Sequence, residues 1–136
     1  MQFEQTSELI WLLYTLGLTG LLWVPYIVQL IIQLGPIKAI WDPEGTHPHD
    51  AQWALRAKRA HYNAIENLAV FAPLVLITLG LKLQSETTAM ACAVYFFARA
   101  CHYLIHLFAL PVLRTVAFLI GFACQALLFI NILGNL

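Results

Sequence analysis

Two stripes of ionisable and polar residues interrupt otherwise apolar parts of the sequence. The first stripe advances by three, four and three residues, and consists of Arg56, Arg59, Asn63 and Glu66. The second advances by three and four residues, with a further arginine after it, and consists of Arg99, His102, His106 and Arg114. Steps of three and four place side chains on one face of an α-helix. Because charged groups are expensive inside a membrane or a protein core, we expect the two stripes to face one shared polar pocket.

A pocket with several cations, one amide and one carboxylate fits a small zwitterion that carries a net negative charge. Arginine binds carboxylates through two parallel hydrogen bonds, Glu66 is suited to an ammonium group, and Asn63 is suited to a peptide amide. A peptide-like thiol meets this description. Beside Arg114 and the start of a following helix, such a thiol would be held as a thiolate, which is the nucleophilic form.

Two other interpretations of the stripes stay open. In the first, the arginines only follow the excess of positive charge on the cytoplasmic side of membranes, and Glu66 and Arg99 form a structural ion pair. In the second, His102 and His106 are two metal ligands one helical turn apart, joined by Glu66 or His61. The sequence has no HExxH motif and no carboxylate-rich cluster, so we predict no metal.

The elements that must position these residues are membrane helices. Of 136 residues, 61% are hydrophobic and 10% are charged, whereas a soluble domain has roughly a quarter charged. The mean hydropathy is +0.77. The charges cancel, which leaves no basic surface for a nucleic acid backbone, so we expect no nucleic acid partner. The sequence predicts an all-α integral membrane four-helix bundle in a single domain over 1–136, with helices at about 9–34, 51–82, 87–110 and 112–133.

Local features refine this topology. Pro25 lies inside the first helix, where a kink is expected, and a polar loop follows Gly35. The loop histidines, His47 and His49, are expected to be solvated. One side of the membrane collects almost all the basic residues of the connections, namely Lys38, Arg56, Lys58, Arg59 and Arg114, against Lys82 on the other. That side is predicted to be cytoplasmic, so the pocket opens to the cytoplasm and both termini lie away from it.

The remaining polar residues of the apolar segments are given structural roles. The cysteines Cys92, Cys101 and Cys124 lack the CxxC spacing of metal or redox sites and are interpreted as buried packing residues. Gln125 and Asn131 are interpreted as hydrogen-bonding residues between helices.

The residues Arg59-Ala-His-Tyr-Asn63 followed by Glu66 resemble the RAHxNxxE motif of the MAPEG family, the membrane-associated proteins of eicosanoid and glutathione metabolism. The resemblance extends over essentially the whole chain, through Ala98-Arg-Ala-Cys-His-Tyr103 and Pro111 to Arg114-Thr115. It implies a homotrimer of four-helix subunits. Glutathione would be bound as a co-substrate between neighbouring subunits, next to a lipid-facing cleft for an apolar electrophile.

The resemblance also implies roles for individual residues. Glutathione would be bound by Arg59, Asn63, Glu66, His102 and His106, with Arg56 reaching a carboxylate. Arg114 would be the catalytic residue that stabilises the thiolate, and Thr115 would add a hydroxyl donor. Two positions depart from the family pattern. Tyr62 stands where some members have a basic or amide residue, and His106 stands where the eicosanoid enzymes tend to have tyrosine.

The leading hypothesis is therefore a membrane-bound glutathione transferase that attacks lipophilic electrophiles, with peroxidase activity toward lipid hydroperoxides also open. The alternative is a non-catalytic lipid-binding or scaffold member of the same fold. A small transporter that uses Glu66 and the histidines as a proton relay is a third hypothesis.

Overall fold

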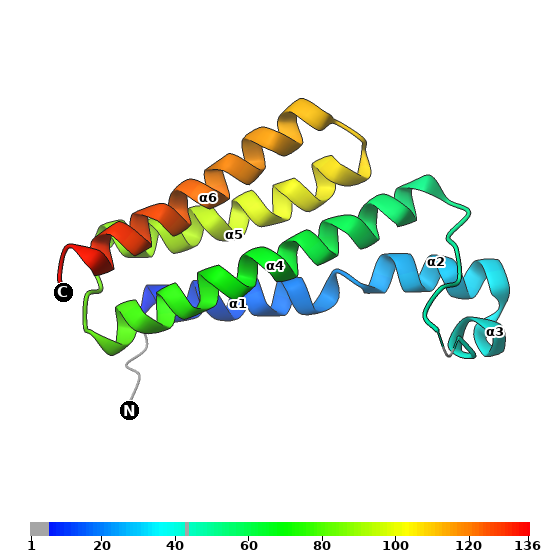
Figure 1. Cartoon of the computed structure of the whole chain (residues 1–136), viewed down its shortest axis with the longest axis horizontal. Helices are drawn as coiled ribbons and strands as arrows, with labels where there is room; N and C mark the ends of the chain where they lie inside the picture. Colours follow the sequence, from blue (N-terminus) through cyan, green and yellow to red (C-terminus); the bar gives the residue numbers. More distant parts are fainter. Residues whose placement is uncertain (1–5, 43) are drawn as a thin grey trace.

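The computed structural model describes residues 6–42 and 44–136, and the regular structure within them is entirely helical (Figure 1). Four helices or helix pairs are long and apolar enough to cross a membrane. The elements are α1 (Ser7–Leu21), α2 (Val24–Leu34), α3 (Pro36–Ile40), α4 (Gln52–Gly80), α5 (Glu86–Leu107) and α6 (Pro111–Leu133). The shortest crossing has 22 residues. At about 1.5 Å per residue this is long enough for a hydrocarbon core of about 30 Å. The predicted all-α membrane bundle is confirmed.

The helix ends differ from the predicted ones by a few residues. The third crossing ends at Leu107, where the sequence predicted 110. Ala109 has a φ of 58°, which a right-handed helix cannot accommodate, and Pro111 starts α6 in the first-turn position that suits proline. The second crossing ends at Gly80, just before Lys82 with a φ of 55°.

The expected kink of the first crossing is present and separates α1 from α2. It falls at Leu22 and Trp23, so that Pro25 lies in the first turn of α2. N–H groups of a first turn make no hydrogen bond within the helix, so the missing N–H of proline costs nothing there. The Tyr103 hydroxyl of α5 donates to the Leu22 carbonyl at 3.1 Å. A neighbouring helix therefore satisfies a backbone group at the break, as membrane helices require.

The helices form a bundle in which α5 and α6 make a hairpin and α4 packs against both of them and against α1 and α2 (Figure 1). The start of α1, the carboxy terminus and the α4–α5 connection lie at one end of the molecule, and the α5–α6 turn lies toward the other. In the core, the rings of Phe71 and Tyr95 stack at a centroid distance of 3.7 Å, which joins α4 to α5. Near the termini, the Thr88 hydroxyl donates to the buried Glu8 carboxylate at 2.6 Å and ties α5 to α1.

The connection between α3 and α4 is held against α2, and this corrects the interpretation of His49 as a solvated loop residue. His49 is only 6% exposed, and its Nδ1 lies 2.8 Å from Gln29 Oε1. The Gln33 side chain donates to the Pro48 carbonyl and accepts from the Asp50 N–H. Burial, followed by the positive charge of Lys58, lowers the pKa of His49.

The structural roles assigned to the other polar residues are confirmed in part. Gln125 Nε2 of α6 donates to the Asn67 carbonyl of α4 at 2.9 Å, as an interhelical residue should. The same role is not found for Asn131, whose buried Nδ2 has no hydrogen-bond partner among the described residues. Cys92 and Cys124 are buried, but Cys101 is exposed, so the packing role is wrong for Cys101. It lies on the outer face of α5, and helical periodicity does not by itself reveal which face that is.

Candidate functional site

A small polar cavity lies where α4, α5 and α6 meet, toward the α5–α6 turn. Its volume is about 220 Å³. The six lining residues are Asn63, His102, His106, Arg114, Thr115 and Phe118. Five of them were predicted as site residues from the sequence, and Phe118 was not. His102, His106 and Arg114 of the second stripe therefore line one space, whereas Asn63 alone reaches it from the first stripe.

The histidines come from consecutive turns of α5, and Arg114 comes from the first turn and a half of α6. The imidazole rings of His102 and His106 meet edge to face at a centroid distance of 5.7 Å. Arg114 Nη1 lies 3.2 Å from His106 Nε2, which fixes the guanidinium at the cavity. The amino-terminal end of α6 adds its partial positive charge on the same side. The cavity thus offers a strongly positive environment within a membrane crossing.

Arg99 lies directly behind the cavity wall and is 2% exposed. Its Nη2 donates to Asn63 Oδ1 and lies 3.4 Å from His102 Nδ1. Its guanidinium carbon is 6.0 Å from the centre of the Phe118 ring, close enough for a cation–π interaction. Arg99 was placed on the second stripe by its spacing but was not predicted as a site residue. Its position three residues before His102 was the signal that marked it.

The ion pair between Arg99 and Glu66 that the sequence left open is replaced by a different contact. Arg99 bonds to Asn63, and its Nε and Nη1 have no hydrogen-bond partner within residues 6–42 and 44–136. Glu66 is exposed on α4. A Cβ added at Gly121 would lie 3.5 Å from Arg99 Cδ. A methyl group at Gly121 would only touch the buried arginine, whereas a larger side chain would need the space in which the arginine lies.

Three predicted residues are not brought into the cavity by this single chain. Arg59 and Glu66 are exposed on α4. Arg56 donates from Nε to the Leu107 carbonyl at 2.9 Å and so caps the end of α5.

Thr115 lines the cavity, but its hydroxyl donates to the Pro111 carbonyl at 3.0 Å, so its oxygen is left as an acceptor.

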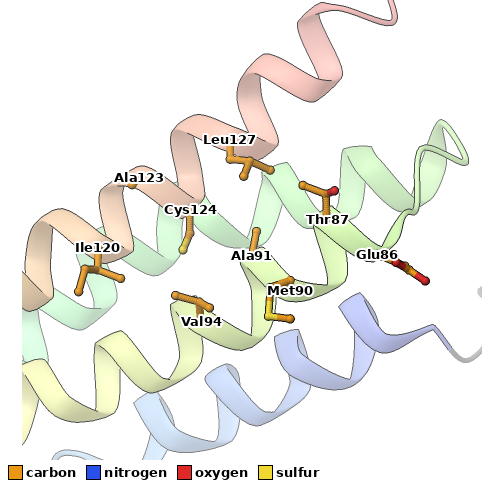
Figure 2. Close-up of a pocket in the computed structure, with 9 residues that line it drawn as sticks. All are labelled: Glu86, Thr87, Met90, Ala91, Val94, Ile120, Ala123, Cys124 and Leu127. Carbon is orange, nitrogen blue, oxygen red and sulfur yellow. The ribbon is translucent and has the colours of Figure 1, made fainter.

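A larger groove of about 530 Å³ lies between α5 and α6, nearer the end that holds the termini (Figure 2). Apart from Glu86 and Thr87 at one end, its walls are apolar: Met90, Ala91, Val94, Ile120, Ala123, Cys124 and Leu127. These lining residues include no cation and no imidazole. The groove can hold hydrocarbon, whereas the arginine and histidine side chains that could take part in a reaction lie in the smaller cavity.

Metal binding finds no support in the arrangement of donors. Over residues 6–42 and 44–136, no group of three or more His, Cys, Asp and Glu side chains is placed to hold a metal ion. His102 Nδ1 and His106 Nε2 each face an arginine nitrogen instead.

Comparison with known proteins adds one finding. The model of the MAPEG family matches residues 9–134, which is nearly the whole chain and includes all of the cavity. Comparison with curated proteins and with solved structures gave no significant match.

Proposed function

Because the chain belongs to the MAPEG family, we propose that it is a membrane-bound glutathione transferase that holds glutathione as a thiolate beside Arg114. The family includes glutathione transferases and related enzymes as well as non-catalytic members. The observation that carries the proposal is the Arg114–His106 contact at the edge of a polar cavity inside an apolar crossing.

In this proposal Arg114 activates the thiol without a general base. A guanidinium next to the sulfur favours the thiolate over the thiol, and the low dielectric of the site strengthens that preference. The proton is released to water on binding. The preformed thiolate then attacks an electrophilic carbon and forms the carbon–sulfur bond. In a substitution the leaving group departs with the electron pair of the broken bond, and in an addition the resulting anion takes up a proton from water. Positioning and electrostatic stabilisation supply most of the catalysis.

The rest of glutathione is bound by the other cavity residues, Asn63, His102 and His106, with Thr115 beside Arg114. A cavity of about 220 Å³ is smaller than the roughly 300 Å³ or more of a typical small-molecule site. We therefore place Arg56, Arg59 and Glu66 around the part of the tripeptide that extends beyond it. Because Arg59 and Glu66 are exposed on α4, this arrangement needs a second copy of the chain, as in a homotrimer.

The apolar substrate reaches the thiolate from the lipid. Side chains around the start of α6 are largely exposed and apolar, with Val112 at 75%, Leu113 at 53% and Val116 at 48%. In a membrane these surfaces face hydrocarbon, so a lipophilic electrophile or a lipid hydroperoxide can approach Arg114 without crossing water. Reduction of a hydroperoxide would use the same thiolate. In this proposal the site faces the cytoplasm and both termini lie away from it, because an excess of basic residues is typical of the cytoplasmic side.

The test is an ultraviolet difference titration of the purified protein with glutathione near neutral pH, which detects the absorbance of a bound thiolate. We expect a signal in the wild type and none in Arg114→Ala. Lys38→Ala, which removes an exposed positive charge from α3, serves as the matched control and should keep the signal. No thiolate and no displaceable glutathione in the wild type would reject the proposal. The lipid-binding alternative, which the apolar groove of Figure 2 favours, would then take its place.

A further inference from the structure

Arg99 is a buried cation whose hydrogen bonds go to two residues of the cavity wall. It lies in the middle of α5, is 2% exposed, and bonds through Nη2 to Asn63 and His102. Its Nε and Nη1 have no hydrogen-bond partner, and no carboxylate is among the contacts recorded for it in the described part of the chain. A buried charge without an opposite charge is costly, so its retention within a membrane crossing indicates a function.

The chemistry of the guanidinium fixes the roles of both partners. Arginine has only N–H donors and no acceptor, so each group that bonds to it must accept. Asn63 therefore presents its oxygen to Arg99, and its NH₂ group remains for another partner. His102 accepts at Nδ1, so the proton of its neutral ring is on Nε2.

The same reasoning applies to His106 and Arg114. His106 Nε2 accepts from Arg114 Nη1, so the proton of the neutral ring is on Nδ1. That Nδ1 is buried, and no described residue of the chain forms a hydrogen bond with it. The two arginines together thus leave three side chains of the cavity wall with an N–H group to offer: Asn63, His102 and His106.

We infer that Arg99 is a positioning residue that makes Asn63 and His102 hydrogen-bond donors toward the cavity, so that the cavity accepts an anionic group such as a carboxylate or a thiolate. Arg99 contacts both of these donors and Arg114 lines the same cavity, so the two guanidinium groups add a positive potential in a low dielectric. An ammonium group, which has only N–H donors and a positive charge, would leave these donors and charges unsatisfied. The identity of the anion as part of glutathione rests on the proposed function, but the donor assignment does not.

A purely structural role for Arg99 is the competing explanation. Its guanidinium packs beside Gly121 and near Phe118, and it joins α5 to α4. Such a role needs the bulk and the contact with Asn63, but it does not need a particular proton position on His102.

The experiment measures the ring nitrogens of His102 by ¹⁵N NMR of histidine-labelled protein in lipid nanodiscs, since the chemical shifts of protonated and unprotonated nitrogens differ widely. His102→Gln assigns the signals among the five histidines. We expect the wild type to carry the proton on Nε2. Arg99→Met, which cannot donate, should lose this preference and give a mixture of tautomers. Arg99→Gln is the matched variant, because it also lacks the charge but keeps an N–H donor, and it should retain the Nε2 proton.

The result that overturns the inference is a wild-type His102 with its proton on Nδ1, or the same tautomer population in Arg99→Met as in the wild type. Thermal unfolding of both variants checks that they fold. If Arg99→Met does not fold, the wild-type spectrum still tests the inference, because it gives the tautomer of His102. For the ligand, we expect the KM for glutathione to rise about tenfold in Arg99→Met and less in Arg99→Gln, with kcat nearly unchanged because Arg114 is intact. Failure of glutathione to bind the wild type would reject the proposed function and leave the tautomer result standing.

Discussion

Arg114 and His106 meet across the α5–α6 turn, with the guanidinium Nη1 3.2 Å from the imidazole Nε2. They are eight residues apart, and the short connection around Ala109 brings the end of α5 back against the start of α6. This contact holds a flexible arginine in one place, and a positioned guanidinium is what thiolate stabilisation needs.

Replacing His106 should therefore lower activity through Arg114. We expect His106→Phe to reduce kcat by about tenfold or more, since a hydrogen bond to a charged group contributes about 1.5–3 kcal/mol. His106→Gln retains an acceptor and should lose less. Steady-state conjugation rates with a lipophilic electrophile measure both variants. Equal losses of kcat in His106→Phe and His106→Gln would show that His106 does not act through its hydrogen bond to Arg114.

Removing Asn63 should destabilise the fold as well as the site. Asn63→Ala deprives the buried Arg99 of a partner, so we expect a loss of about 2 kcal/mol and a midpoint of thermal unfolding lower by several degrees. Ile65→Ala, at an exposed position of the same helix, is the control. Thermal unfolding in detergent followed by circular dichroism provides the comparison, and a midpoint equal to that of the control would contradict the buried Arg99–Asn63 contact.

Gly121 gives a test of the space around Arg99. The Cβ of Gly121→Ala would lie 3.5 Å from Arg99 Cδ, which is ordinary van der Waals contact, and alanine favours a helix over glycine by about 0.5–1 kcal/mol. We expect this variant to be at least as stable as the wild type. Gly121→Val adds two methyl groups against the guanidinium and Tyr95, and should lower the unfolding midpoint and raise the KM for glutathione. If Gly121→Val kept both the unfolding midpoint and the KM of the wild type, Arg99 would be free to move.

If neighbouring subunits share the site, two inactive variants should restore activity when they form mixed oligomers. Arg114→Ala removes the thiolate-stabilising group and Glu66→Ala removes an exposed binding group, and each alone should be nearly inactive. If the two residues of one site come from different copies, mixed oligomers of the two variants contain intact sites. We expect co-expressed chains to recover conjugation activity above that of either variant. Activity no higher than that of separately purified variants would place both residues of a site on one chain.

The connection between α3 and α4 should respond to acid through His49. Because burial and then Lys58 lower the pKa of His49, the undocked loop binds a proton more readily than the docked one. Docking is therefore fully stable above the ordinary histidine pKa of about 6.5, weakens as the pH falls below it, and levels off below the lowered value. Tyr26, Asp42, His47 and Lys58 line the same pocket as His49. Limited proteolysis of the loop should accelerate from about pH 7.5 to about pH 5.5 in the wild type. It should stay constant in His49→Gln, and a wild-type rate that does not change would rule out this coupling.

The sequence by itself determined that the chain forms a bundle of membrane helices. It also determined which residues share a face of each helix. Long apolar segments are recognised by local composition, because every residue of a crossing must meet hydrocarbon. Proline positions located the kink near Pro25 and the start of α6 at Pro111. Steps of three and four placed His102 and His106 on one face of α5, since the helical repeat is a property of the backbone alone.

Only the tertiary structure decided which of these faces meet. Arg99 and Glu66 are both charged members of the two stripes, yet Arg99 is buried against Asn63 and Glu66 is exposed. His49 is buried because Gln29 and Gln33 of α2 hold its loop, although its own neighbours are polar turn formers. The rotation of each helix is set by packing between distant residues, such as Phe71 on Tyr95 and Arg99 beside Gly121. These contacts depend on the shapes of side chains brought together from different helices, and the periodicity of a single segment carries no information about them.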